Sequence, residues 1–133
     1  MGLKPEEDLV SHLATQLSLT AGTDIFYRPV LPPDDYVAEK AVFVFPFGGP
    51  PPQAMLGETE AVRRSMIIVR VRGDQDDFDG ALLFARQVRD EIRYADIANY
   101  IDWRLESTEP FYLGQDDERH PEFSITCEAM YEE

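Results

Sequence analysis

The sequence has little cysteine and no long apolar segment. Cys127 is the one cysteine, which excludes an intramolecular disulfide and a cysteine-rich zinc site and fits a reducing compartment. The longest apolar runs, Ala41 to Phe47 and Met66 to Val69, are far shorter than the ~20 residues that a membrane-spanning helix needs. The first residues are acidic, whereas a signal peptide begins basic and becomes apolar. We therefore expect a chain that folds in the cytoplasm and does not enter a membrane.

Positive charge is also scarce. The 133 residues carry 12 Lys and Arg against 26 Asp and Glu, a formal charge of −14, and Lys4 and Lys40 are the only lysines. Tight binding to nucleic acid or an anionic membrane needs Lys and Arg against phosphates, so only a local basic stripe would allow it. At 44% hydrophobic and 11% aromatic residues, the chain is too apolar for a disordered acidic tail. Its length predicts a single domain, residues 1–133.

The side-chain sets that catalysis requires are missing from the sequence. His12 and His120 are the only histidines, and they offer neither a metal-binding pair nor a nucleophile with its base. Cys127 falls on the apolar face of a predicted strand, which indicates a core residue rather than a nucleophile. Gly48 and Gly49 precede prolines instead of a helix, so they do not form a phosphate loop. We expect no enzymatic activity and no cofactor.

Two acidic runs invite comparison with metal-binding loops. The first consists of Asp74, Asp76, Asp77 and Asp79. With Gly80 as the sixth residue of a calcium loop, the twelfth must be Glu, but Arg86 stands there. Acidic residues at the start of a helix explain the first run, because the helix dipole favours them. The second run, Gln115 to Glu118, has no regular ligand spacing and indicates a solvated loop. We therefore expect no metal.

Hydrophobic periodicity predicts two helices and five strands. One helix spans Pro5 to Leu17, and the other, capped by Asp74, ends at about Arg93. The strands are predicted at Asp24 to Arg28, Ala41 to Phe45, Arg63 to Arg72, Ile101 to Thr108 and Glu122 to Tyr131. The almost wholly apolar run Ala41 to Phe45 indicates a central strand covered on both faces. The order α-β-β-β-α-β-β predicts an α/β chain of the α+β type, with both helices packed on one face of a mainly antiparallel or mixed sheet.

Two long loops interrupt these elements. Pro46 to Val62 holds four prolines and three glycines, and Pro110 to Pro121 forms the second loop. Loops of this length in a compact domain are usually functional or disordered. Aromatic residues stand at the loop roots, namely Phe45, Phe47, Phe111 and Tyr112. Either these aromatics belong to the core and the loops are idle, or the loops bind other proteins. We interpret the first loop as a flap that a partner orders.

Three arginines share one face of the strand that runs from Arg63 to Arg72, namely Arg64, Arg70 and Arg72. In a chain this acidic, arginines on one surface oppose the repulsion between identical subunits, which predicts a subunit boundary. The alternative is pairing within one chain, with Glu106 or Glu128 across the sheet.

The succession of motifs resembles a known family. A short amphipathic helix precedes Phe47-Gly48-Gly49 and its proline-rich continuation. The next strand ends with the sequence Val69 to Asp74, and the helix after it contains Ala81 to Ala85. The segment Pro110 to Asp117 then precedes a strand that ends at Tyr131. This order is similar to that of the tail terminator proteins of tailed bacteriophages, also described as minor capsid, tail completion or head-tail joining proteins. The resemblance covers nearly the whole chain.

The resemblance implies a structural virion protein, assembled in the host cytoplasm, that forms a homo-hexameric ring at the head-tail junction. Such a ring caps the tail tube, stops polymerisation of the major tail-tube protein and binds a head-completion or connector protein. DNA would pass through the acidic ring without tight binding. The residues expected at interfaces are Phe47, Gly48, Gly49, Pro50, Pro51, Pro52, Met55, Leu56, Arg64, Arg70, Arg72, Phe111, Tyr112, Asp116 and Asp117. The alternative is a small acidic cytoplasmic adaptor or inhibitor that binds a basic protein.

Overall fold

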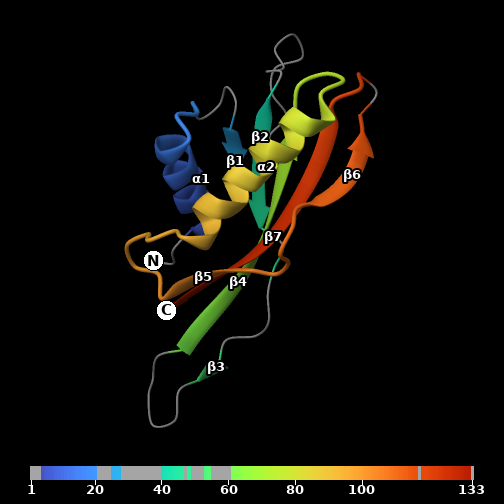
Figure 1. Ribbon diagram of the computed structural model, residues 1–133. Coiled ribbons are helices and arrows are strands. Elements are labelled where there is room, and N and C mark those ends of the chain that lie inside the picture. Colours follow the sequence, from blue (N-terminus) through green and yellow to red (C-terminus); the bar gives the residue numbers. More distant parts are fainter. Residues whose placement is uncertain are drawn as a thin grey trace.

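The fold combines two helices with a seven-stranded mixed sheet. The computed structural model describes residues 4–20, 25–27, 40–46, 48, 53–54, 61–116 and 118–132. The helices are α1 (Pro5–Gln16) and α2 (Phe78–Arg93). The strands are β1 (Ile25–Tyr27), β2 (Ala41–Pro46), β3 (Gln53–Ala54), β4 (Ala61–Arg72), β5 (Asp102–Leu105), β6 (Phe111–Gln115) and β7 (Pro121–Glu132). Both helices lie on one face of the sheet (Figure 1), so the predicted α+β architecture is confirmed.

The long strands β4 and β7 form the middle of the sheet. They pair in antiparallel register from Val62 opposite Glu132 to Arg72 opposite Glu122. The strand order is β1-β2-β4-β7-β5, with β3 paired to β4 and β6 paired to β7. The β1–β2 pair is parallel and the other pairs are antiparallel. The predicted strand Ala41 to Phe45 is an interior strand of the sheet, because β2 is paired with β1 on one side and with β4 on the other.

The core fills the space between the helices and the sheet. Leu9 and Leu13 of α1 are fully buried. The buried face of α2 consists of Ala81, Phe84, Ala85, Val88 and Ile92, the three- and four-residue spacing predicted from the sequence. The cap of α2 is Asp77, whose carboxylate accepts a hydrogen bond from the Gly80 amide at 3.0 Å. The prediction that Asp74 caps this helix was therefore wrong.

Alternate residues of the central strands face this core. The inward residues are Ile67, Val69 and Val71 of β4 and Phe123, Ile125, Cys127, Ala129 and Tyr131 of β7, all buried as predicted. Burial, aided by the charge of Glu106, raises the pKa of the Cys127 thiol to about 12, as is typical of a core cysteine. In β2, Val42 and Val44 are fully buried, whereas Phe43 and Phe45 on the opposite face are only partly buried. The second face of this strand is only partly covered in the described part of the chain, because Ala41 is buried but Phe43 and Phe45 are partly exposed.

Both predicted loops contain regular structure. β6 lies inside the predicted loop Pro110 to Pro121, and β3 lies inside Pro46 to Val62, which also contributes residues to β2 and β4. A two-residue strand has no detectable alternation, and a register shift between Tyr112 and Gly114 interrupts the alternation in β6. The interpretation of the first loop as a flap falls mostly on residues that lie outside the described ranges.

Gly73 is a point of close approach between the sheet and α2. It follows β4, and its amide donates to the Pro121 carbonyl at 2.9 Å. A Cβ atom added here would clash with the Ala81 side chain and would lie 2.8 Å from the Ala81 Cα. Only a residue without a side chain allows α2 to lie this close to the sheet.

We expect Gly73→Ala to lower the free energy of unfolding by about 1–3 kcal/mol, because α2 must shift to relieve the clash. Chemical denaturation of this variant, of Ala81→Gly and of the double variant measures the effect. Ala81→Gly carries its own cost of about 1 kcal/mol as a glycine in a helix. Since it removes the clashing Cβ, the double variant should be more stable than the sum of the two losses predicts. Additive losses would contradict this explanation.

Candidate subunit interface

An exposed apolar strand forms part of one edge of the sheet. β6 pairs with β7 and with no other strand in the described part of the chain (Figure 1). Its residues Phe111, Tyr112 and Leu113 are 68%, 44% and 43% exposed. Native edge strands are usually short, charged or covered, because their free N–H and C=O groups can pair with another chain. β6 is short, but its outward side chains are apolar, which suits contact with a second protein.

Tyr112 holds β6 against the core. Its ring packs edge-on against Phe78, the first residue of α2, with 5.1 Å between centroids. It also lies 5.3 Å from the buried ring of Phe123, with which it is in register. Phe111, one residue earlier, points to the opposite face of the sheet. The structure thus brings the two predicted interface residues into one strand and gives them different surroundings, with Tyr112 packed on its neighbours and Phe111 exposed.

The turn after β6 is fixed by Asp116. One carboxylate oxygen accepts hydrogen bonds from the backbone amides of Glu118 and His120, both at 2.9 Å. The His120 ring is buried, with Nδ1 3.0 Å from the carbonyl oxygen of Gly73. Arg119 forms an ion pair with Asp76 at 3.3 Å. Asp116 was predicted at an interface, and the structure shows it shaping the turn that joins β6 to β7.

The three predicted arginines of β4 have different surroundings. Arg64 Nε donates to Glu128 at 3.1 Å, across the sheet, and the Glu128 side chain is 6% exposed. Arg72 is buried, with its guanidinium 6.0 Å from the centre of the Phe43 ring. Arg70 is exposed. Pairing within the chain therefore holds for Arg64, whose side chain is 31% exposed, and Arg70 is the most exposed of the three.

The remaining predicted interface residues lie mostly outside the described ranges. These are Phe47, Gly49, Pro50, Pro51, Pro52, Met55, Leu56 and Asp117. Gly48 is described: its carbonyl accepts a hydrogen bond from the Met66 amide at 2.7 Å. Its φ of +82° is a conformation that glycine adopts without strain. Gly48 therefore lies against β4 immediately beyond β2.

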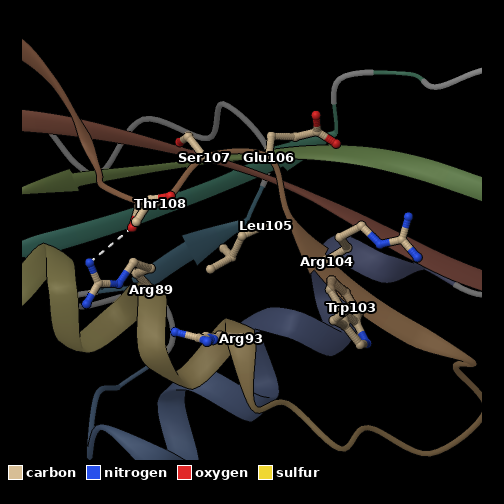
Figure 2. A pocket seen from close by; sticks show the side chains of 8 residues that line it. All are labelled: Arg89, Arg93, Trp103, Arg104, Leu105, Glu106, Ser107 and Thr108. Atoms are coloured by element: carbon tan, nitrogen blue, oxygen red, sulfur yellow. Dashed lines mark hydrogen bonds between the residues drawn. The ribbon is translucent and has the colours of Figure 1, made fainter.

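An arginine-rich cleft, which the sequence reasoning missed, opens between α2 and β5. It has a volume of about 440 Å³ (Figure 2). Its lining residues are Arg89, Arg93, Trp103, Arg104, Leu105, Glu106, Ser107 and Thr108. The spacing of Arg86, Arg89 and Arg93 places the three on one side of α2 and was visible in the sequence. Arg104 comes from β5, where it is in register with Glu128, and its guanidinium points away from Arg89 and Arg93 (Figure 2).

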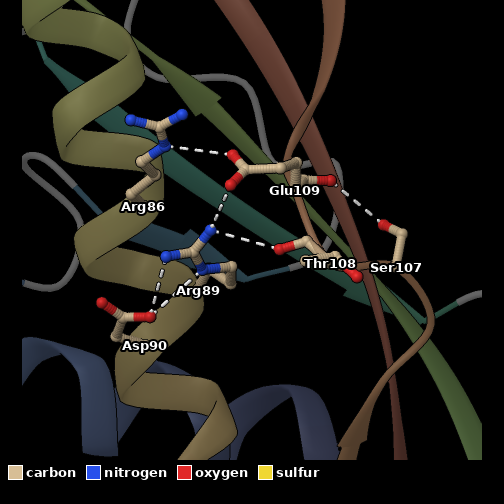
Figure 3. A network of polar contacts seen from close by, with 6 residues as sticks. All are labelled: Arg86, Arg89, Asp90, Ser107, Thr108 and Glu109. Carbon is tan, nitrogen blue, oxygen red and sulfur yellow. Dashed lines mark hydrogen bonds and ion pairs between the residues drawn. The ribbon is translucent and has the colours of Figure 1, made fainter.

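A network of ion pairs builds one wall of this arginine cleft (Figure 3). Arg89 donates to the Thr108 carbonyl and to the Glu109 carboxylate, each at 3.1 Å, and pairs with Asp90 at 3.1 Å. Arg86 donates to the other Glu109 oxygen at 3.0 Å. The hydrogen bond from Arg86, together with the charges of both arginines, lowers the pKa of Glu109. The bend after β5 is thereby held against α2.

The described residues contain no group of three or more His, Cys, Asp or Glu side chains that could hold a metal ion. Neither α1 nor α2 is long and apolar enough to cross a membrane, and no other helix is described. Comparison of the chain with protein-family models and with curated proteins finds no match.

We expect Arg64→Met to lower the free energy of unfolding by about 1–3 kcal/mol, because Glu128 would be left buried without its cation. Arg70→Met is the matched control on the same strand and face. Because Arg70 is exposed, its replacement should change stability by no more than about 0.5 kcal/mol. Chemical denaturation at low protein concentration compares the two. Equal effects would show that the Arg64–Glu128 pair does not stabilise the fold.

Proposed function

We propose that this protein is a structural assembly subunit of a phage or phage-derived tail. Six copies form a ring at the head-proximal end of the tail tube, at the head-tail junction of the virion. The ring stops polymerisation of the major tail-tube protein and binds the head-completion or connector protein. The subunit is assembled in the host cytoplasm, uses no cofactor and has no enzymatic activity.

The apolar edge strand β6 is the observation that carries this proposal. Phe111 and Leu113 are exposed on a strand that is paired with β7 and packed through Tyr112 on Phe78 and Phe123, so a partner would bind a strand that is already formed. The opposite edge of the described sheet is β1, a different surface. Contact between two different surfaces of identical subunits produces a ring whenever the rotation between subunits closes. The resemblance seen in the sequence supports the same assembly independently.

Charge supports the proposed passage of DNA through the ring. Each subunit contributes a formal charge of −14. Tight DNA binding requires a continuous set of Lys and Arg facing phosphates, each of which adds affinity by releasing counterions. On the face of the sheet opposite the helices, Arg64 and Arg72 are occupied by Glu128 and Phe43. An acidic passage of this kind would let DNA slide without adhering to it.

Sedimentation velocity over a range of protein concentrations tests the ring. We expect a species near six times the 15.2 kDa of one chain, visible as a ring by negative-stain electron microscopy. A monomer or dimer that persists at the highest concentration would contradict the ring. It would favour an acidic adaptor or inhibitor that binds a basic protein.

We expect Phe111→Glu to abolish the ring species, because it places a charge in the centre of the proposed contact. Because the Phe111 side chain is 68% exposed, the free energy of unfolding should change by no more than about 0.5 kcal/mol. Ile101→Glu is the matched control. Ile101 is 55% exposed and immediately precedes β5, the other strand on this edge of β7. Equal loss of assembly in both variants would contradict a specific role for β6.

A further inference from the structure

The face of the sheet opposite the helices, which we call the open face, is apolar at its centre (Figure 1). Its central side chains are Phe43, Phe45, Met66, Ile68, Thr126 and Met130, all partly exposed. A sheet face that meets only water usually carries polar side chains. We propose that the open face packs against the open face of a second copy of this chain. This inference goes beyond the proposed ring and does not depend on it, because the ring contact was assigned to the edges of the sheet.

The register of three strands joins these apolar side chains into one surface. Ile68 of β4 lies between Phe45 of β2 and Thr126 of β7, so the three form a row across the sheet. Side chains that face each other on neighbouring strands are in contact, because their Cβ atoms lie about 4.5–5.5 Å apart. Met66 and Met130 extend the apolar surface along β4 and β7. Ile68 is therefore the centre of the open face.

The open face is nearly neutral in a strongly acidic chain. The described strands place four arginines and four acidic side chains on it, namely Arg64, Arg70, Arg72, Arg104, Asp102, Glu122, Glu128 and Glu132. Glu106, immediately after β5, adds one negative charge at its margin. Almost all of the formal charge of −14 therefore belongs to the rest of the chain. Identical acidic chains repel each other, and the open face is the surface on which they can approach with least repulsion. A basic partner would be attracted to the acidic surfaces instead.

The charges on the open face also complement each other from end to end. At one end, Arg70 and Arg72 outnumber Glu122. At the other end, the three remaining acidic side chains outnumber the two remaining arginines. A twofold axis perpendicular to the strands places the positive end of one copy over the negative end of the other. Arg70 is exposed and has no carboxylate within ion-pair distance among the described residues, so it is available to the second copy.

The open face is large enough for a specific contact. β4 and β7 are paired from Val62 to Arg72, a length of about 36 Å at ~3.3 Å per residue. β2 and β3 lie on one side of this pair and β5 and β6 on the other, which gives a width of roughly 19 Å at ~4.8 Å per strand. The short outer strands leave gaps, so each copy would contribute roughly 600 Å². Two copies then exceed the roughly 1,000 Å² in total that separates specific interfaces from chance contacts.

Sedimentation velocity of the Ile68→Glu variant tests the contact. Twofold symmetry brings the two new carboxylates close together at the centre of the interface, so two chains should associate at least about tenfold more weakly. Ile68→Thr keeps the branched shape that suits a strand and adds no charge, and it should weaken association severalfold. Leu83→Glu is the matched control, because Leu83 is 60% exposed on α2, on the other side of the sheet. It changes the net charge by the same amount and should associate like the wild type.

Cross-linking gives a positive signal for the same contact. Thr126→Cys places a thiol next to Ile68, and a bismaleimide of about 10 Å spans the distance between two stacked sheets. The expected product contains two chains, twice the 15.2 kDa of one. Cys127 is fully buried and should not react. Leu83→Cys is the control and should remain a single chain.

The outcomes separate this contact from the proposed ring. If both contacts exist, wild-type rings associate further through their open faces, and Ile68→Glu leaves single rings. Wild-type protein that stops at two chains, cross-linked through Thr126→Cys, would support the open-face contact and contradict the ring. Normal association of Ile68→Glu without a cross-linked Thr126→Cys product would overturn the contact and leave the ring. Normal association with a large loss of stability in Ile68→Glu would show that the open face is covered within one chain, which would also overturn the inference.

Discussion

The antiparallel pairing of β4 with β7 is the constraint on which the rest of the structure depends. Its register places Ile67, Val69 and Val71 on the same face as Phe123, Ile125 and Cys127, so one face of the sheet is apolar and is covered by both helices. A shift by one residue would turn these side chains to solvent and bring Arg64, Arg70 and Glu128 into the core. The same register places Arg64 within hydrogen-bonding distance of Glu128. The strands β5 and β6 both pair with β7.

Core packing and surface charge meet in α2. One side of this helix buries Phe84 and Val88, and its two ends carry charges of opposite sign. Because Gly73 allows the helix to lie close to the sheet, the Arg89 network can reach across to the bend after β5 and form a wall of the arginine cleft. The packing that stabilises the fold thus also positions the Arg89 network.

The sequence was sufficient to predict the long elements, because periodicity accumulates over many residues. It placed α2, β4 and β7 and their buried faces, and it identified Cys127 as a core residue. It missed β6, because the register shift between Tyr112 and Gly114 interrupts the alternation of inward and outward side chains. It could not separate Asp74 from Asp77 as the helix cap, since both stand before the same apolar pattern. It missed the cleft between α2 and β5, because the nearness of these two elements follows from strand order, which local patterns do not determine.

The division of one sheet edge between two short strands has a consequence for aggregation. β5 has four residues and β6 has five, and they cover different parts of β7. Gly114, at a φ of +106°, bends β6 where it would otherwise continue straight. Fibril growth requires a long, flat strand that each arriving chain can copy. An edge this short and bent is a poor template for fibril growth. Many copies of this subunit can therefore lie close together, with their aromatic residues exposed, without adding strands to one another end on end.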